Sequence, residues 1–530
     1  MPSNRRFEMN RRTFTLGPLA AAAAAHSGFL PSAAAAGVSA PAAEPIALGD
    51  RRELFLDDLL IDRLEGTAER RLHHPIPREL ALTHDAPWEG TGSGYHSVFQ
   101  DGPLYRMYYK AWHLDVSSGK LRTNAHPLFC CYAESDDGIH WRKPNLGLVE
   151  FQGSKANNIV IASGSLGGAE VDAGHPAVFK DENPDAPETA RYKAILRSAS
   201  PNGLIPLGSP DGLRWSALSD RPVITNGVFD SQNLAFWDPT HGTYRAYWRF
   251  FTRARPGAPA LRAIRTATSP DFLHWSESTD LTYEDSPDEE LYTNQVKPYA
   301  RAPHLLVGFP TRYVDRGWSD SMRALPEREH REARDAAGKR YGTAITEALV
   351  MSSRDGLRFQ RWNEAFLRPG IEREGAWNYG HQYVAWHLVE TRSALPGAPD
   401  ELSLYAGESY WTGTSSALRR YTLRPDGFVS LSASRAGGAL TTPPITFQGK
   451  TLRLNFSSAV SGGVRVAILD PAGEPIPGFS QAEGDEIFGD ALDRPVTWTQ
   501  GANLGELAGR PVRLRFTLRD ADLYAFRFSS

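Results

Sequence analysis

The stretch Ser135-Asp136-Asp137-Gly138-Ile139-His140-Trp141 is one of several copies of the pattern Ser-x-Asp-Gly-x-x-aromatic in this chain. Further copies begin at Ser209, Ser269 and Ser353, and a more divergent one is Arg424-Pro425-Asp426-Gly427-Phe428. An Asp that caps its own backbone, a Gly with positive φ and an aromatic ring beneath them are typical of a hairpin turn. The pattern therefore predicts a recurring β-hairpin.

Strand patterns precede each copy of the hairpin. An aromatic segment such as Tyr105-Arg106-Met107-Tyr108-Tyr109-Lys110 comes directly before it, and another apolar segment comes before that one. The five earlier segments cover residues 96–100, 175–180, 232–238, 295–300 and 382–387. Repeated units of three or four strands indicate a β-propeller. We therefore expect an all-β protein in which residues 50–432 form five blades, with residues 53–61 as the strand that closes the ring.

The C-terminal region has a different sequence pattern. Residues 438–530 contain alternating strands, such as 451–456 and 463–468, and no copy of the hairpin motif. About 90 residues of alternating strands favour a β-sandwich. Residues 316–340 are charged and compatible with helix, which predicts an insertion within the fourth blade.

Composition limits the function classes. The chain has 530 residues, 11% of them aromatic, with 47 Gly and 38 Pro, as expected for a turn-rich β protein. The net charge of −4 argues against a nucleic-acid partner. No apolar run after the N-terminal segment approaches the length of a membrane span, so no membrane association is expected once that segment is cleaved.

The N-terminal segment resembles a twin-arginine export signal. Arg11 and Arg12 precede a weakly apolar, Ala-rich run, and small residues suited to cleavage follow it. We interpret residues 1–42 as a signal peptide and linker, which predicts a periplasmic or secreted protein. Cys130 and Cys131 are the two cysteines of the chain, and their adjacency argues against a disulfide framework.

These features resemble known carbohydrate-active enzymes. Five blades followed by a β-sandwich resemble glycoside hydrolase family 32, and the propeller alone also resembles families 43 and 68. The stretches FLDDLLID, SDDGIHWRKPNLGLVEF, FDSQNLAFWD and LYTNQVKPY are similar to bacterial proteins related to those families. The resemblance implies hydrolysis of a glycosidic bond in an oligo- or polysaccharide. Family 32 opens its first blade with Asn-Asp-Pro-Asn, whereas this chain has Gly92-Ser93-Gly94-Tyr95, so the family's carboxylate trio cannot be transferred.

Polar residues stand where the inner strands begin, at the propeller face on which ligands bind. The second strands end at the same face, and their last positions carry cations in register. Convergent polar groups of this kind favour a substrate pocket, and the cations favour an acidic or sulfated glycan. The alternatives are a hydrated channel whose groups satisfy one another, and cations that pair with acids at the rim. The candidate substrate-binding residues are His96, Lys110, His175, Arg197, Gln232, Asn233, Arg249, Asn294, Gln295, Arg312 and His381.

Cleavage of a glycosidic bond generally uses two carboxyl groups, one protonated and one ionised. We expect a carboxyl group that is partly desolvated against Trp or Tyr to keep its proton near neutral pH. Trp112 and Tyr410 are among the aromatic residues that could stack on a sugar. The candidate catalytic residues are Asp230, Asp172, Glu408 and Glu89.

Two other functions stay open on the sequence: a glycan-binding propeller without catalysis, and a sialidase-like hydrolase, although sialidases usually have six blades. No cofactor is expected, because the chain lacks a glycine-rich nucleotide-binding motif. A metal at the channel centre, held by His96, His175 or His381, has no supporting spacing signature.

Overall fold

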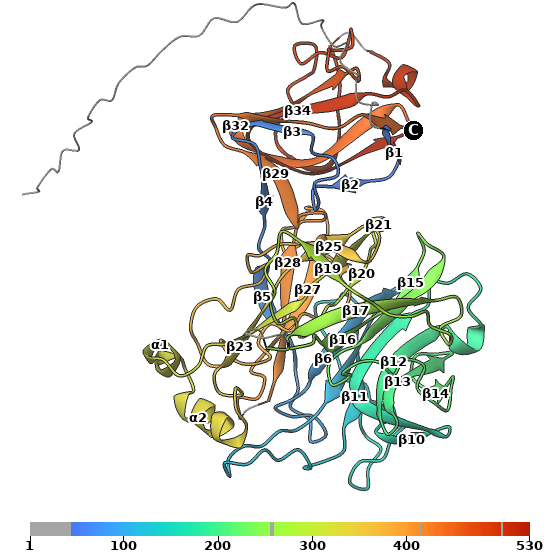
Figure 1. Cartoon of the computed structure of the whole chain (residues 1–530), viewed down its shortest axis with the longest axis vertical. Coiled ribbons are helices and arrows are strands. Elements are labelled where there is room, and N and C mark those ends of the chain that lie inside the picture. The colour runs from blue at the N-terminus through green and yellow to red at the C-terminus, as the bar shows by residue number, and fades with distance from the viewer. Residues whose placement is uncertain (1–43, 255–258, 414, 500–501) are drawn as a thin grey trace, which may run out of the picture. The chain divides into compact units, whose positions relative to one another are not determined.

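The computed structural model describes residues 44–254, 259–413, 415–499 and 502–530, so the predicted signal segment lies outside the described residues. Strands dominate the described chain, and five of the sheets are the blades of a β-propeller (Figure 1). The prediction of a five-bladed all-β propeller is confirmed.

Each blade is a sheet in which most neighbouring strands are antiparallel. Blade I contains β6 (Gly94–Asp101), β7 (Leu104–Ala111), β8 (Phe129–Ser135) and β9 (Ile159–Ala162). Blade II contains β10 (Gly164–Leu166), β11 (Ala169–Lys180), β12 (Tyr192–Ala199), β13 (Asn202–Ser209) and β14 (Ser216–Ala217). Blade III contains β15 (Leu234–Asp238), β16 (Thr243–Phe251), β17 (Arg262–Ser269) and β18 (Thr279–Asp280).

The last two blades draw strands from distant parts of the chain. Blade IV contains β20 (Lys297–Tyr299), β21 (Ala302–Gly308), β24 (Met351–Ser353) and β25 (Arg358–Arg361), with β19 (Thr282–Glu284) added in parallel at its edge. Blade V contains β26 (Val389–Thr391), β27 (Glu401–Glu408) and β28 (Ala417–Leu423), and its outer strand is β5 (Ile76–Thr83).

The ring is closed by β5, which pairs antiparallel with β28 and lies beside it in Figure 1. The prediction that residues 53–61 close the ring is wrong. In that stretch β2 (Glu53–Leu54) pairs with the C-terminal strand β34 (Arg513–Ser529). The blade strands therefore lie within 76–423 rather than within 50–432.

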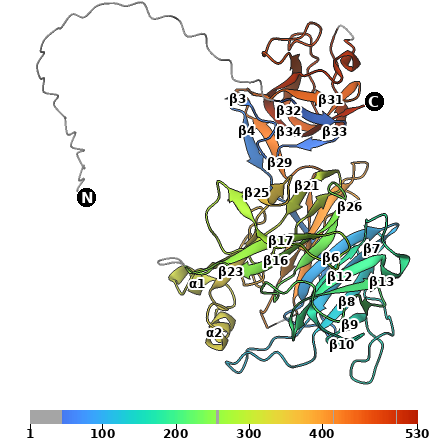
Figure 2. The same cartoon turned by 45° about the vertical axis from the view of Figure 1, so that its right-hand side comes forward.

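The C-terminal β-sandwich combines strands from both ends of the chain. Its long strands β32 (Thr451–Leu469) and β34 pair along most of their length. The N-terminal β4 (Glu69–Leu72) pairs with β29 (Val429–Ala433), as Figure 2 shows. The remaining strands are β1 (Ile46–Gly49), β3 (Arg63–Gly66), β30 (Gly438–Thr441), β31 (Ile445–Phe447) and β33 (Asp490–Pro495). Leu454, Phe516 and Phe526 belong to the separate apolar core of this module.

The predicted insertion in blade IV is confirmed. The hairpin of β22 (Thr311–Asp315) and β23 (Ala344–Ala348) carries two helices, α1 (Asp320–Ala324) and α2 (Arg328–Ala337). Among the described residues no helix is long and apolar enough to span a bilayer.

The repeated hairpins have the geometry that their sequence predicts. In the first copy, Asp137 Oδ1 accepts hydrogen bonds from the backbone N–H groups of Ile139 and His140, both at 2.8 Å. Gly138 has a φ of 70°. The Trp141 indole packs below and donates to the Gly138 carbonyl at 3.2 Å.

Tyrosines from neighbouring blades hold three of these hairpins. In each case the phenol of a second strand donates to the carbonyl of the hairpin glycine in the adjacent blade. The pairs are Tyr108 with Gly212 and Tyr247 with Gly356, each at 2.9 Å, and Tyr405 with Gly138. These buried bonds fix how adjacent blades pack.

We expect Gly212→Ala to destabilise the protein more than Gly242→Ala. Both glycines have positive φ, 78° and 60°. A Cβ at Gly212 would lie 2.5 Å from the Tyr108 hydroxyl, whereas a Cβ at Gly242 would meet nothing within 4 Å. Overpacking of this kind costs about 1–3 kcal/mol. Chemical denaturation should show Gly212→Ala losing that much more unfolding free energy. Equal losses would mean that the contact between the blades does not constrain the hairpin.

Candidate functional site

The starts of the inner strands and the ends of the second strands meet at one face of the propeller. Register pairs Gly94 of β6 with Lys110 of β7, and Asp172 of β11 with Arg197 of β12. The structure thus brings the predicted cations to the same end as the polar strand starts. We call this end the strand-start face.

Two carboxylates on this face each pair with an arginine. Asp172 Oδ2 lies 3.0 Å from His175 Nδ1 and 3.4 Å from Arg197 Nη1. Asp230, in the segment that leads into β15, forms an ion pair with Arg249 near the end of β16. We call these five residues the Asp172–Asp230 cluster. The Asp230 side chain is 49% exposed and that of Arg249 only 3%, so Asp230 is the accessible member of its pair.

Both carboxyl groups are ionised at neutral pH. Burial raises the pKa of Asp172, but the charge and hydrogen bond of His175, with help from Gly174 N–H and Arg197, bring it down to about 2. Burial also raises the pKa of Asp230, but the charges of Arg249 and His175 outweigh burial and lower the pKa. Neither Asp172 nor Asp230 is thus the carboxyl group expected to keep its proton near neutral pH, because each has a cationic partner.

Lys110 on this face is a buried amine with a pKa shifted towards neutrality. Burial lowers the pKa of its amine to about 7, although the charge of Asp172 opposes the shift. Lys110 Nζ donates to the Tyr410 hydroxyl at 3.0 Å. It also lies 4.3 Å from the ring centroid of Tyr95 and 4.9 Å from that of Trp112. The amine is therefore enclosed by aromatic rings.

An aromatic layer lies beside the cluster. Tyr383 stacks on Tyr95 at 6.0 Å between centroids and on Tyr292 at 5.6 Å, and the Arg249 guanidinium lies 4.6 Å from the Tyr292 centroid. Tyr95 has a φ of 52°, which is strained for a tyrosine. Strained backbone of this kind concentrates at functional sites.

The sequence analysis missed most of this layer. Tyr95, Tyr292 and Tyr383 each lie within two residues of a polar strand start that had been singled out. That adjacency was a usable signal. It was hidden because tyrosines are frequent in blade packing throughout the chain.

Glu408 and Glu89 occupy structural positions. Glu408, at the end of β27, lies 2.5 Å from Arg373 and 2.7 Å from Arg419. Burial raises its pKa, but these cations outweigh burial and lower it. Glu89 is fully buried and accepts hydrogen bonds from the Tyr109 hydroxyl, Lys143 Nζ and the Ala86 N–H. Neither carboxylate contacts the Asp172–Asp230 cluster through these bonds.

Gln232 and Gln295 bond to one another. Gln232 Nε2 donates to the carbonyls of Tyr95 and Pro176, both at 3.0 Å. Gln295 Nε2 donates to Gln232 Oε1 at 2.8 Å and to the Val384 carbonyl at 2.7 Å. These bonds tie blades together, as the alternative of a self-satisfied channel predicts.

The other predicted binding residues are also engaged within the protein. Asn233 and Asn294 bond to nearby backbone, His96 lies 3.0 Å from His84, and His381 accepts from Trp377 N–H at 2.9 Å. Arg312 pairs with Glu347 at 2.6 Å and with Glu289 at 3.1 Å. Their role in binding substrate stays a prediction, and the geometry favours a structural one.

Three histidines were considered for a metal at the channel centre. His175 is bonded to Asp172, and His96 and His381 have the separate partners given above. Within the described ranges, no group of three or more His, Cys, Asp or Glu side chains is arranged to hold a metal ion.

No family model matches this chain, and no curated protein does. Solved structures match it at low similarity. One is described as a complex of BT0996 with RGII, with 12% identity and a TM-score of 0.42 over 67% of this protein and 93% of that one. A glycoside hydrolase has 12% identity and a TM-score of 0.41 over the same shares.

A third similar structure comes from the GH130 family of mannoside phosphorylases. That family contains glycoside hydrolases that target β-1,2-mannosidic linkages in Candida mannan. The structure has 12% identity and a TM-score of 0.40 over 68% of this protein and 96% of that one. The resemblance to families 32, 43 and 68 stays a prediction. With similarity this low, function has to be read from the residues of the site.

We expect Lys110→Met to change how stability depends on pH. The folded-state pKa of about 7 lies below the usual Lys value, so the unfolded chain binds more protons between about pH 7 and pH 10.5. Wild-type stability therefore gains up to about 1.4 kcal/mol per pH unit across this window from Lys110 alone, and loses it as the pH falls. The variant lacks this slope.

Chemical denaturation of both proteins at several pH values measures the difference. The stability of Lys110→Met relative to wild type should be greatest below pH 7 and should shrink towards pH 10. Parallel curves would show that the amine keeps an ordinary pKa.

Proposed function

We propose that this chain is a glycan-active hydrolase that cleaves a glycosidic bond at the Asp172–Asp230 cluster. The observation that carries the proposal is the half-exposed, ionised Asp230 beside a second carboxylate, Asp172, that binds a histidine. An accessible carboxylate and an oriented imidazole together supply a base and an acid. The rings of Tyr95 and Tyr292 offer apolar faces suited to a sugar.

The roles follow from protonation. Asp172 is ionised, so it accepts from His175 Nδ1, and the hydrogen on that nitrogen is fixed. In our proposal the protonated His175 gives its Nε2 proton to the leaving oxygen of the scissile bond. Asp230 either takes a proton from the attacking water or attacks the anomeric carbon itself. The anomer released first, detected by NMR, distinguishes these two routes.

Charge balance favours a neutral glycan. Arg197 pairs with Asp172 and Arg249 pairs with Asp230, so the two arginines that suggested an acidic ligand are already neutralised. Pairing with rim acids was the alternative that the sequence left open. Neutral and uronate-containing oligosaccharides should both be screened, and we expect turnover of neutral ones.

We expect Asp230→Asn to lower kcat by about 10²- to 10⁴-fold on the substrate that the screen identifies. Asp280→Asn is the matched control, because Asp280 is 53% exposed and pairs with Arg265 in the same blade. Steady-state kinetics should show the control close to wild type. Loss of activity in both variants, or in neither, would remove Asp230 from the catalytic assignment.

A glycan-binding propeller without catalysis is the second candidate. It is favoured by the low pKa of both cluster carboxylates, since neither can serve as a protonated acid at neutral pH. Binding of a glycan without any product would support this candidate. Five blades rather than six weigh against the sialidase-like alternative.

We also propose export by the twin-arginine route, on the sequence of residues 10–36 alone. Replacing Arg11 and Arg12 with Lys should leave precursor in the cytoplasm, because the transporter reads the arginine pair. Fractionation and immunoblotting of cells that express both forms measure this. Equal secretion of the two forms would refute the route.

A further inference from the structure

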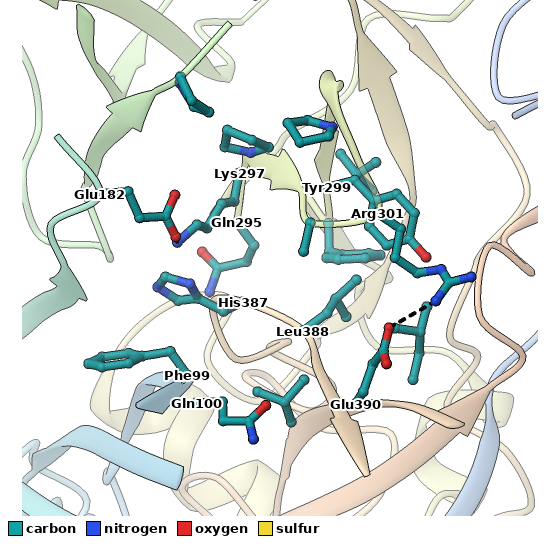
Figure 3. A pocket seen from close by; sticks show the side chains of 18 residues that line it. Phe99, Gln100, Glu182, Gln295, Lys297, Tyr299, Arg301, His387, Leu388 and Glu390 are labelled. Atoms are coloured by element: carbon teal, nitrogen blue, oxygen red, sulfur yellow. Dashed lines mark hydrogen bonds and ion pairs between the residues drawn. The ribbon is translucent and has the colours of Figure 1, made fainter. Parts of the chain in front are cut away.

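A cavity of about 430 Å³ lies at the opposite end of the propeller channel from the Asp172–Asp230 cluster. Much of its lining comes from the ends of the inner strands and the turns after them: Phe99 and Gln100 lie at the end of β6, Tyr299 ends β20, and Glu182 follows β11. Lys297, which begins β20, and Gln295, which precedes it, complete one side. Figure 3 shows Glu182, Lys297, Gln295 and His387 gathered on one side of this cavity, with the Arg301–Glu390 ion pair on the other. We call it the strand-end cavity.

Gln295 belongs to the lining of this cavity and carries a buried acceptor without a partner. Its Nε2 donates to Gln232 Oε1 at 2.8 Å and to the Val384 carbonyl at 2.7 Å, which fixes the orientation of the amide. Gln295 is 2% exposed, and among the described residues its Oε1 has no hydrogen-bond partner. An acceptor buried without a partner costs about 1–3 kcal/mol.

His387 carries a second buried nitrogen without a partner. Burial lowers its pKa well below the usual value, so the ring is neutral, and a hydrogen bond with the Val178 backbone opposes that shift. We assign the hydrogen of the neutral ring to Nδ1, which leaves Nε2 as the acceptor. His387 is 7% exposed, and within the described part of the chain Nε2 has no partner. Nε2 is therefore a bare acceptor.

The charges around these acceptors are balanced. Lys297 Nζ lies 3.6 Å from Glu182 Oε1, and Arg301 Nη1 lies 3.3 Å from Glu390 Oε1. Lys297 also lies close enough for its charge to depress the pKa of His387, so a cation near Nε2 would be repelled. An anion would find two acceptors without hydrogens. The lining therefore suits a neutral ligand with hydroxyl donors.

The remaining walls are apolar. Phe99, Leu388, Val307 and Leu402 line the cavity together with the Tyr299 ring. A ligand that presents hydroxyls on one side and C–H groups on the other matches this lining. Sugars and other polyols have this character, and a cavity of about 430 Å³ holds a single sugar residue.

We propose that the strand-end cavity is a second binding site, which takes one neutral sugar residue or a polyol of similar size. Hydroxyls donate to Gln295 Oε1 and His387 Nε2, while Lys297 and Glu182 serve as further donor and acceptor. The site does not depend on the function proposed for Asp230.

The test is isothermal titration calorimetry of the full chain with glucose, galactose, mannose and sorbitol, and with sodium acetate and ammonium chloride as ionic probes. We expect at least one neutral probe to bind. His387→Leu removes one acceptor and should weaken binding about tenfold or more, equivalent to about 1.4 kcal/mol. His241→Leu is the matched control, since His241 is absent from the cavity lining.

Gln100→Trp gives an independent check, because Gln100 is exposed at the cavity and its replacement should obstruct the cavity without disturbing the core. Asp230→Asn separates the two ends of the channel and should leave this binding unchanged. Binding of the ionic probes alone, failure of all four neutral probes, or binding insensitive to both cavity variants would each overturn the proposal. A crystal structure soaked in the neutral probes that shows water only would do the same.

Discussion

The tyrosine that reaches from one blade to the hairpin carbonyl of the next is the contact on which the propeller depends. It requires glycine in the hairpin, because a Cβ at Gly356 would lie 2.8 Å from the Tyr247 hydroxyl. In blade III the corresponding position is Phe272 with a φ of 71°, and its own ring packs on Tyr244 at 5.3 Å. In three of its copies the hairpin motif is thus a joint between neighbouring blades.

The packing of neighbouring blades decides which side chains bond to one another between blades. Gln232 and Gln295 bond to one another across blades, which engages Gln232 Oε1 and Gln295 Nε2 within the protein. The Asp172–Asp230 cluster keeps an accessible carboxylate, because the Asp230 side chain is 49% exposed. Chemistry is therefore expected at this cluster rather than at the bonded glutamines.

Charge pairing gives Asp230 two roles. Arg249 is almost fully buried, and a buried guanidinium without its carboxylate is costly. The same pairing keeps Asp230 ionised at neutral pH, as a base or nucleophile must be. It also prevents Asp230 from acting as a protonated acid, which leaves that task to His175. The Asp172–Asp230 cluster thus offers an exposed carboxylate, whereas the strand-end cavity combines two neutral acceptors with the Lys297–Glu182 and Arg301–Glu390 ion pairs.

The sequence by itself determined the five repeated units, the hairpin geometry, the insertion in blade IV and the set of cations and carboxylates at the strand ends. Such features depend on turn chemistry and alternation within about ten residues. Only the tertiary structure decided that Ile76–Thr83 closes the ring, that Glu89 and Glu408 are held in structural contacts, and that Lys110 titrates near neutrality. Strand closure depends on which distant edge stays open, and a pKa depends on burial and partners summed over several blades. Neither the closing strand nor the pKa can therefore be predicted from a local stretch of sequence.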